Sequence, residues 1–359
     1  MGLRALALSV VGLALAAPAH GQDAPAPAKP AWSVEDPGGP YRDLEFDANE
    51  GTWISVDCSP DGTRLAFDLL GDIWTMPIAG GDATCVADGL PWEHQPRWSP
   101  DGNRLLFTSD RGGGDNLWTM AADGSDRKAL TSEDYRLFNN GNWHPSGRFV
   151  VGRKHFTSRR SLGAGEMWLL PFPEGGVGLQ ITKRKNDQQD AGEPVFSPDG
   201  TRLYWSEDMS GGERFEYNKD PHGVIYRVRQ RDLETGEVRD LLSLPGGAVR
   251  PQPSPDGKSL AFVRRSGNGS VLSLLDLGTA AVRDLWDGLS LDQQETWAIF
   301  GPHPGYSWTP DGASIVISAR GRIWRVAVAD GKAAEIPFRA PVKQRLCETV
   351  RTPGSEGAP

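Results

Sequence analysis

Apolar and polar residues alternate at a period of two in many short segments of this chain, a pattern typical of β-strands with one buried face. The clearest segments follow a tetrapeptide with proline at its second position and glycine at its fourth. Proline fixes φ early in a tight turn, and glycine tolerates the positive φ near the turn's end. Each tetrapeptide therefore predicts a corner between two antiparallel strands. The six corners are Ser59-Pro60-Asp61-Gly62, Ser99-Pro100-Asp101-Gly102, His144-Pro145-Ser146-Gly147, Ser197-Pro198-Asp199-Gly200, Ser254-Pro255-Asp256-Gly257 and Thr309-Pro310-Asp311-Gly312.

Two further strands are predicted after each corner. The segments directly after the corners are TRLAFDL, NRLLFTS, RFVVGR, TRLYWSE, KSLAFVR and ASIVISA. The next predicted strands are DIWTMPI, NLWTMAA, EMWLLPF, VIYRVRQ, VLSLLDL and RIWRVAV. A glycine-bearing turn and a short fourth strand are expected to complete each unit.

The spacing of the corners distinguishes between two repeat architectures. Their prolines lie 40, 45, 53, 57 and 55 residues apart. A solenoid of parallel rungs needs a short and nearly constant period, whereas propeller blades of four antiparallel strands tolerate loops of different lengths. Packing such blades around an axis also covers both faces of every sheet. We therefore predict an all-β fold, a six-bladed β-propeller with four-stranded antiparallel blades.

Aromatic residues and turn aspartates recur within the units. Five of the six predicted third strands carry an aromatic residue at one place, namely Trp74, Trp118, Trp168, Tyr226 and Trp324. An aromatic ligand cage is conceivable, but packing between neighbouring sheets explains a fixed position in every blade better. The corner aspartates are interpreted as hydrogen-bond acceptors within their own turns rather than as metal ligands.

The two ends of the chain differ from the repeats. Arg4 precedes a 13-residue apolar run that ends at Ala17 and is followed by small residues, which predicts a signal peptide at 1–21 and a periplasmic protein. An uncleaved anchor is the alternative, although the run is short for a bilayer, and no later segment resembles a membrane span. An Ala/Pro-rich linker is predicted at 22–43, the propeller at 44–340 and a C-terminal tail at 341–359. The segment Asp43 to Phe46 is expected to pair with the final blade and fasten the ring.

Net charge and cysteine placement exclude one class of partner and one disulfide bond. Cleavage after residue 21 would leave a net charge of -10, which argues against a nucleic-acid partner. The three cysteines are an odd number for an exported chain, and Cys58 and Cys85 are expected on the first and fourth strands of one blade. That placement separates them by roughly 14 Å, beyond the reach of a disulfide bond.

Known catalytic motifs are absent from the sequence. It has no Gly-x-Ser-x-Gly elbow, His-Glu-x-x-His helix, His-x-His pair or phosphate loop, so we predict no catalytic residue, no metal and no cofactor.

Long insertions offer the better guide to a binding surface. Successive turns of a blade alternate between its two ends, and all four long insertions are predicted on the end opposite the corners: 154–166, 206–223, 182–193 and 287–305. Loops that grow on one face are where propellers usually bind. An ion-pair network that only orders the loops is the alternative. The candidate partner-binding residues are Lys154, His155, Arg159, Arg160, Glu166, Asp190, Glu193, Glu216, Tyr217, Lys219, Asp220, His222, Glu295 and Trp297.

Longer strings within these regions resemble one known family. They are KHFTSRRSLGAGEMW at 154–168, NDQQDAGEPVFSPDG at 186–200, EYNKDPHG at 216–223, GGAVRPQPSPDG at 246–257 and QETWAIF at 294–300. Over about residues 44–350 the chain resembles the TolB-like propeller that precedes a metal-dependent amidohydrolase domain in exported bacterial proteins. The metal-binding histidines of that hydrolase have no counterpart here. The resemblance therefore implies a truncated or split relative, without hydrolase activity of its own.

Three hypotheses follow. The first is a non-catalytic periplasmic propeller that holds a protein, peptide or glycan on its insertion-bearing rim. The second is an accessory part of a metal-dependent amidohydrolase or peptidase whose catalytic domain is missing from this chain. The third, which we favour least, is a stand-alone metallohydrolase with ligands from His155, Glu166, Asp190 and His222.

Overall fold

The regular secondary structure of the described residues is entirely β-strand. A computed structural model describes residues 32–155, 164–211, 216 and 218–348. The chain divides into two compact units, residues 1–32 and 33–359, and every described strand lies in the second.

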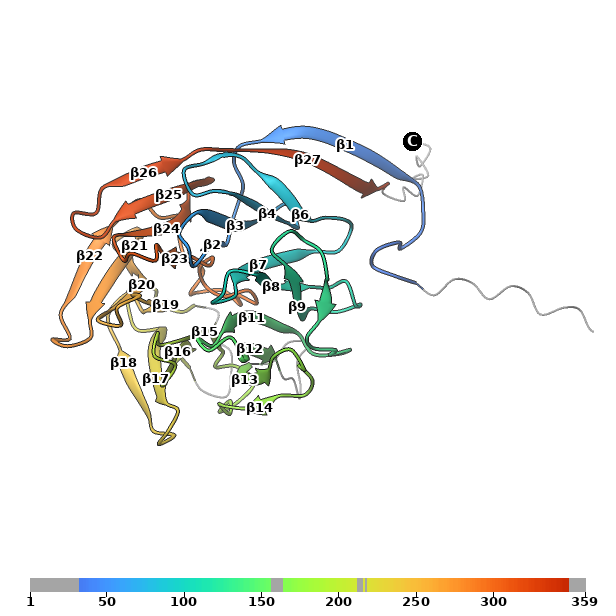
Figure 1. The fold of residues 1–359 in the computed structure, drawn as a ribbon. Coiled ribbons are helices and arrows are strands. Elements are labelled where there is room, and N and C mark those ends of the chain that lie inside the picture. The colour runs from blue at the N-terminus through green and yellow to red at the C-terminus, as the bar shows by residue number, and fades with distance from the viewer. Residues whose placement is uncertain (1–31, 156–163, 212–215, 217, 349–359) are drawn as a thin grey trace, which may run out of the picture. The chain divides into compact units, whose positions relative to one another are not determined.

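Six four-stranded antiparallel sheets follow one another along the chain (Figure 1), and we call them blades 1 to 6. Blade 1 contains β2 (Val56–Cys58), β3 (Arg64–Leu69), β4 (Asp72–Pro77) and β6 (Thr84–Ala87); blade 2 contains β7 (Glu93–Trp98), β8 (Arg104–Ser109), β9 (Asn116–Ala121) and β10 (Lys128–Ala129); blade 3 contains β11 (Phe138–Trp143), β12 (Phe149–His155), β13 (Gly165–Pro171) and β14 (Leu179–Gln180). Blade 4 contains β15 (Ala191–Phe196), β16 (Arg202–Asp208), β17 (Tyr226–Asp232) and β18 (Val238–Leu242); blade 5 contains β19 (Val249–Pro253), β20 (Ser259–Ser266), β21 (Gly269–Asp276) and β22 (Val282–Trp286); blade 6 contains β23 (Ser307–Trp308), β24 (Ser314–Ala319), β25 (Arg322–Ala327) and β26 (Ala333–Ile336). The predicted all-β propeller of four-stranded blades is confirmed.

The Pro/Gly corners join the first two strands of each blade. In blade 1 the Ser59 hydroxyl donates to Asp61 Oδ1 over 2.6 Å and accepts from the Arg64 backbone N–H over 2.9 Å. Equivalent bonds recur at Ser99, Ser197, Ser254 and Thr309. These hydrogen bonds hold the pKa of each corner aspartate below its usual value. The aspartates therefore act within their own turns, as the sequence predicted.

The aromatic residues of the third strands pack between blades, but their predicted alignment was wrong in blade 4. Trp74 lies opposite Phe67 in β3, and Trp118, Trp168 and Trp324 occupy the equivalent place in their blades. In blade 4 that place belongs to Arg229, which lies opposite Trp205 in β16, whereas Tyr226 lies three residues away. In blade 4 the aromatic residue at this level is Trp205 of the second strand, β16. The indole N–H of Trp205 donates to Glu207, which also accepts from Arg229.

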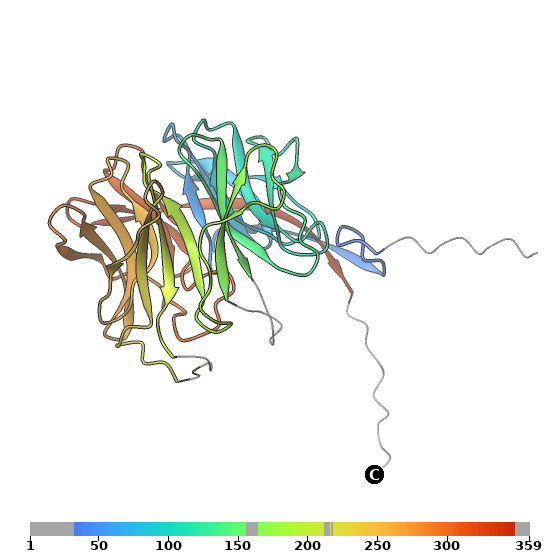
Figure 2. The ribbon, with the colours of Figure 1, turned by 90° about the horizontal axis from the view of Figure 1, so that it is seen from below.

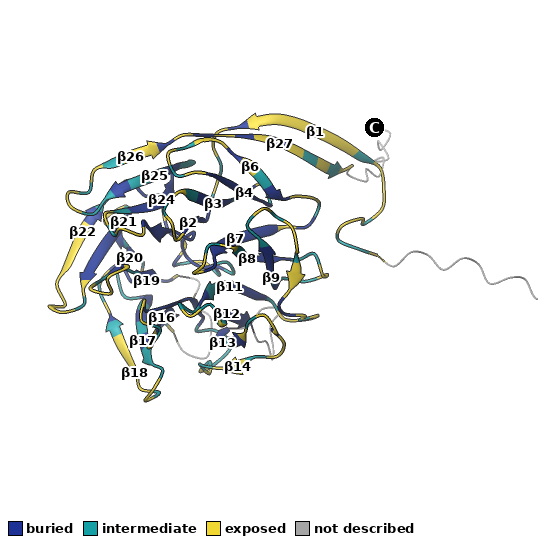
Figure 3. Ribbon diagram, viewed as in Figure 1, coloured by how far each residue is buried: buried dark blue, intermediate teal, exposed yellow. Residues whose placement is uncertain are grey.

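The last blade contacts the first. The Val56 backbone N–H donates to the carbonyl of Gly305, and the Cys58 N–H donates to the Ser307 hydroxyl over 2.8 Å. Hydrophobic residues of both blades form one buried cluster that includes Leu65, Val316 and Ile336. Figure 3 shows that the inner strands are mostly buried and that outer strands such as β18 and β26 carry exposed residues.

A separate ribbon crosses the outside of blade 1. β1 (Tyr41–Ala48) pairs antiparallel with β27 (Phe338–Cys347), and β27 pairs in parallel with the short strand β5 (Gly81–Asp82). The segment Asp43 to Phe46 is thus a strand, but it pairs with β27, which follows blade 6 without joining its sheet. β27 also runs across residue 341, where the tail was expected to begin. Figures 1 and 2 show β1 and β27 side by side, extending beyond the blades.

Outer turns pack closely on the blade before them. Gly124, in the turn between β9 and β10, has φ +87°, and a Cβ there would lie 2.1 Å from the backbone carbonyl oxygen of Val86 in β6. Gly331 has φ +72° and approaches the Leu285 carbonyl of β22 equally closely. Only a residue without a side chain fits such a contact.

We therefore predict that Gly124→Ala lowers the free energy of unfolding more than Gly113→Ala does. Both glycines have positive φ, but a Cβ at Gly113 would meet nothing within 4 Å. The difference between the two variants should be about 1–3 kcal/mol, because only Gly124→Ala forces the blades apart. Urea unfolding of both variants measures it, and equal losses would contradict this account of blade packing.

Candidate functional site

Most of the predicted rim residues that the structure describes are buried and engaged with other residues of the chain. Arg159, Arg160 and Tyr217 lie outside the described residues. The engaged candidates form these ion pairs: Lys154 with Glu133, Glu166 with Arg184, Asp190 with Arg153, Glu193 with Arg250, Lys219 with Asp208, and Glu295 with Arg265. Lys154 also lies 5.0 Å from the centre of the Trp168 ring. These ion pairs agree with the alternative stated above, an ion-pair network that orders the long insertions.

The remaining candidates differ in how far they are buried. His155 is buried, and Trp297 is partly buried. Glu216, Asp220 and His222 are exposed, and the Asp220 carboxylate accepts the backbone N–H of His222 over 3.0 Å. Among the described residues, no three His, Cys, Asp or Glu side chains are grouped so as to hold a metal ion.

A repeated distortion shapes the innermost strands. β7, β11, β15 and β19 each contain a bulge, and each bulge holds a non-glycine residue at positive φ. The four residues occupy equivalent positions and are Gln95, Asn140, Glu193 and Arg250, with φ between 51° and 60°. Left-handed backbone at such residues is strained and is often retained at functional sites.

The bulges direct polar side chains towards the axis, where they fill the space. Glu193 accepts from the Arg250 backbone N–H over 2.6 Å, and its other oxygen lies 3.2 Å from the Arg250 guanidinium. Arg250 also donates to the carbonyls of Phe300 and His303, which holds the connection between β22 and β23 over the axis. This connection, the 287–306 insertion, contains the predicted insertion 287–305. Burial lowers the pKa of Arg250 to about 10. The pocket left between these side chains has a volume of about 10 Å³, which is room for one water molecule at most.

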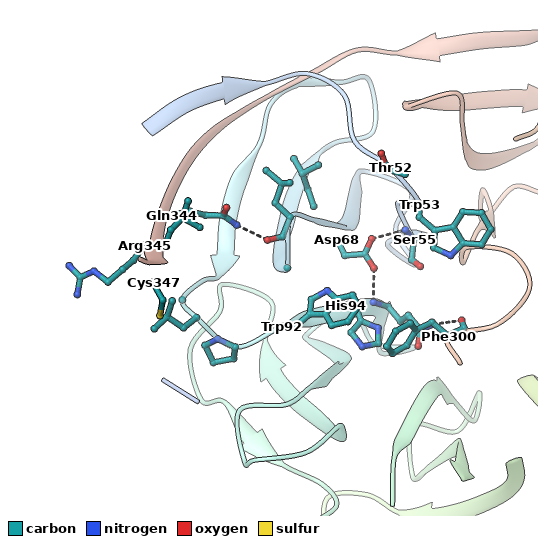
Figure 4. A pocket seen from close by; sticks show the side chains of 18 residues that line it. Thr52, Trp53, Ser55, Asp68, Trp92, His94, Phe300, Gln344, Arg345 and Cys347 are labelled. Atoms are coloured by element: carbon teal, nitrogen blue, oxygen red, sulfur yellow. Dashed lines mark hydrogen bonds between the residues drawn. The ribbon is translucent and has the colours of Figure 1, made fainter. Parts of the chain in front are cut away.

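A much larger pocket lies beside the axis, on the insertion-bearing rim. Its volume is about 550 Å³, within the range of ligand sites. The walls come from the approach to β2, the β3–β4 turn, the segment before β7, the 287–306 insertion and the end of β27. Figure 4 shows Asp68 between Trp53 on one side and Trp92, His94 and Phe300 on the other. Trp53, Leu70 and Gln95, which all line this pocket, have positive φ.

Three rings on one side of the pocket pack against one another. The Trp92 and Phe300 ring centres are 5.0 Å apart, and the His94 ring lies 4.5 Å from Phe300. Trp92 remains 49% exposed, so its indole offers apolar surface to a ligand. Burial lowers the pKa of His94 to about 3, and its Nε2 has no hydrogen-bond partner among the described residues. His94 is therefore neutral at physiological pH.

Asp68 is the acidic group of the pocket. Its two oxygens accept the backbone N–H groups of Ser55, over 2.7 Å, and Gln95, over 2.8 Å. Burial raises the pKa of Asp68 to about 6 despite these bonds. In the described part of the chain, no basic side chain forms an ion pair with it.

Sequence reasoning missed every residue of this pocket except for Phe300, which stands at the end of the QETWAIF string. Asp68 occupies an ordinary polar position in the alternation of its strand. Trp92 lies in the short connection between β6 and β7, which carries no insertion, and His94 is the second residue of β7. The sequence offered one sign of this site: Trp92 is a tryptophan outside the recurring aromatic position of the blades.

Comparisons with known proteins agree with this architecture. Residues 45–164 match the model of the TolB beta propeller domain. The crystal structure of TolB from Acinetobacter baumannii superposes with a TM-score of 0.57 and 18% identity, over 80% of this chain and 66% of that one. The fold is that of a TolB-like propeller.

Curated relatives add a second observation. An uncharacterized peptidase, YuxL of Bacillus subtilis, is 28% identical over 57% of this chain. Tricorn protease homolog 1 of Streptomyces coelicolor is 25% identical over 76% of this chain. The aligned regions cover only 28% and 23% of these relatives, so the chain spans about a quarter of the length of each.

We predict that the contribution of Asp68 to the free energy of unfolding decreases as the pH rises through 6. Because its pKa is about 6 in the folded chain and about 3.9 when unfolded, the folded state binds the proton more firmly. The stabilising contribution is present below pH 4 and is lost as the pH rises through 6. The stability of the wild type relative to Asp68→Asn should fall by about 1–2 kcal/mol between pH 4.5 and 7.5. Urea unfolding at both pH values tests this, and a constant or rising difference would show that Asp68 has no raised pKa.

Proposed function

We propose that this protein is an exported, non-catalytic binding propeller that holds a segment of a protein partner in the pocket around Asp68, Trp92 and Phe300. The observation that carries the proposal is the pocket itself, an aromatic-walled hollow of about 550 Å³ on the insertion-bearing rim. Its size suits one or two side chains of a docked peptide. The pocket between the described residues Glu193 and Arg250 at the axis is far smaller, at about 10 Å³.

The placement of the pocket supports a binding role over a structural one. A residue needed only for packing would be buried, yet Trp92 and Leu70 line the pocket at 49% and 52% exposure. Exposed aromatic surface beside a hollow is characteristic of interaction sites. The positive φ values at Trp53, Leu70 and Gln95 concentrate backbone strain around the same hollow.

The proposed location rests on the sequence of residues 1–21, which has the pattern of a signal peptide. No membrane-spanning helix occurs in the described part of the chain. The proposed periplasmic location follows from the signal-peptide pattern alone.

A second candidate function is supported by the comparisons. The matched relatives include a peptidase and a tricorn protease homolog, each several times longer than the matched region. The chain would then be the propeller of a hydrolase, docking or guiding a catalytic domain, as the amidohydrolase resemblance also implies. The coding DNA that follows codon 359 separates the two: a continuing frame with a hydrolase motif favours this candidate, and an unrelated gene favours the first.

We predict that peptides selected on this protein from a random display library bind through the pocket. Trp92→Ala should weaken such peptides at least tenfold, because truncating a central aromatic anchor typically costs 2 kcal/mol or more. Tyr135→Ala is the matched control, since Tyr135 is 72% exposed and lies outside the pocket. Calorimetric titration of both variants gives the comparison. Peptides that bind both variants as tightly as the wild type would remove the pocket from consideration.

A further inference from the structure

The charge inside the pocket narrows the class of ligand, if the proposed binding function holds. Asp68 is a partly buried carboxylate that accepts the backbone N–H groups of Ser55 and Gln95 and a hydrogen bond from the Ser55 side chain, and no described basic residue balances its charge. A buried charge without an opposite partner is costly, and pairing with a cation recovers part of that cost.

The other ionisable groups that line the pocket do not supply this cation. His94 is neutral because burial lowers its pKa. Arg345 reaches outward instead: its Nε donates to Asp43 Oδ1 over 3.0 Å, and its guanidinium lies 5.7 Å from the Tyr41 ring centre. Figure 4 shows the Arg345 side chain pointing away from Asp68. Cys347 is the remaining ionisable residue among those that line the pocket.

Aromatic side chains line the same pocket as the acidic group. Trp53 lies on one side of Asp68, and Trp92 and Phe300 lie on the other (Figure 4). The faces of such rings attract cations, tryptophan most strongly, and the attraction grows where water is excluded. A carboxylate combined with tryptophan faces favours a positively charged group that also has apolar surface.

We propose that the pocket selects a basic side chain, arginine or lysine, carried by the bound protein segment, with its charged end at Asp68 and its stem against Trp92. Both side chains combine a long apolar stem with a cationic tip. The acidic character of the whole chain, with a formal net charge of -9, also favours the approach of a basic segment.

The test compares two peptides that differ only in charge. Acetyl-Gly-Arg-Gly-amide and its citrulline counterpart have nearly the same shape, but citrulline is neutral. We expect the wild type to bind the arginine peptide at least fivefold more tightly in calorimetric or NMR titrations at low salt. The preference should shrink below twofold in Asp68→Asn and persist in Tyr135→Ala. A lysine peptide should resemble the arginine one.

A second measurement uses the wild type only, because Asp68→Asn can also lose a hydrogen bond to Ser55 or Gln95. On the wild type, raising the salt concentration from 50 to 500 mM should weaken the arginine peptide several-fold and leave the citrulline peptide unchanged. Equal affinity of the two peptides would overturn the proposed selectivity. If display-selected peptides bind in a Trp92-dependent way but contain no basic residue at the pocket, the selectivity fails while the binding function stands. If no peptide depends on Trp92, the binding function itself fails.

Discussion

Backbone N–H groups at three of the four first-strand bulges are satisfied by side chains of the preceding blade, and much of the structure depends on this. The Gln95 N–H donates to Asp68, the Asn140 N–H donates to Gln95, and the Arg250 N–H donates to Glu193. A bulge removes its residue from the strand ladder, so a buried N–H there needs another acceptor. Each acceptor ties one blade to the next at the axis.

The same bonds determine where a ligand can bind. Glu193 and Arg250 pair with each other and with the 287–306 insertion, which closes the axis. Asp68 has the same type of bond to Gln95, yet it faces a pocket rather than a basic partner. Because His94 is neutral and Arg345 is turned towards Asp43, the charge of Asp68 stays available. Asp68 therefore both ties blade 1 to blade 2 through Gln95 and lines the pocket.

The features that the sequence predicted well are local ones. A corner such as Ser59 to Gly62 closes through hydrogen bonds within its own few residues, so its sequence is sufficient to predict it. The blades follow because each strand continues directly from such a corner. The placement of long insertions on one end follows from the antiparallel order of the strands.

The features that were missed depend on residues far apart in the chain. Asp68, Trp92 and Phe300 meet only after the ring closes, and no spacing in the sequence indicates that contact. The register error at Tyr226 has a similar cause, because the insertion before β17 obscures where that strand begins, and the ring found at Trp205 replaces the expected one. Charged insertion residues such as Lys154, Glu166 and Lys219 looked available for a ligand, but these three form ion pairs within the folded chain.

The most direct test of the account follows the indole N–H signals of the tryptophans by NMR, with selective ¹⁵N labelling, as the arginine tripeptide is added. The account predicts that the signals of Trp53 and Trp92 shift while those of Trp143 and Trp308, beside the corners on the opposite rim, do not. Shifts confined to Trp143 or Trp308, with Trp53 and Trp92 unmoved, would contradict it.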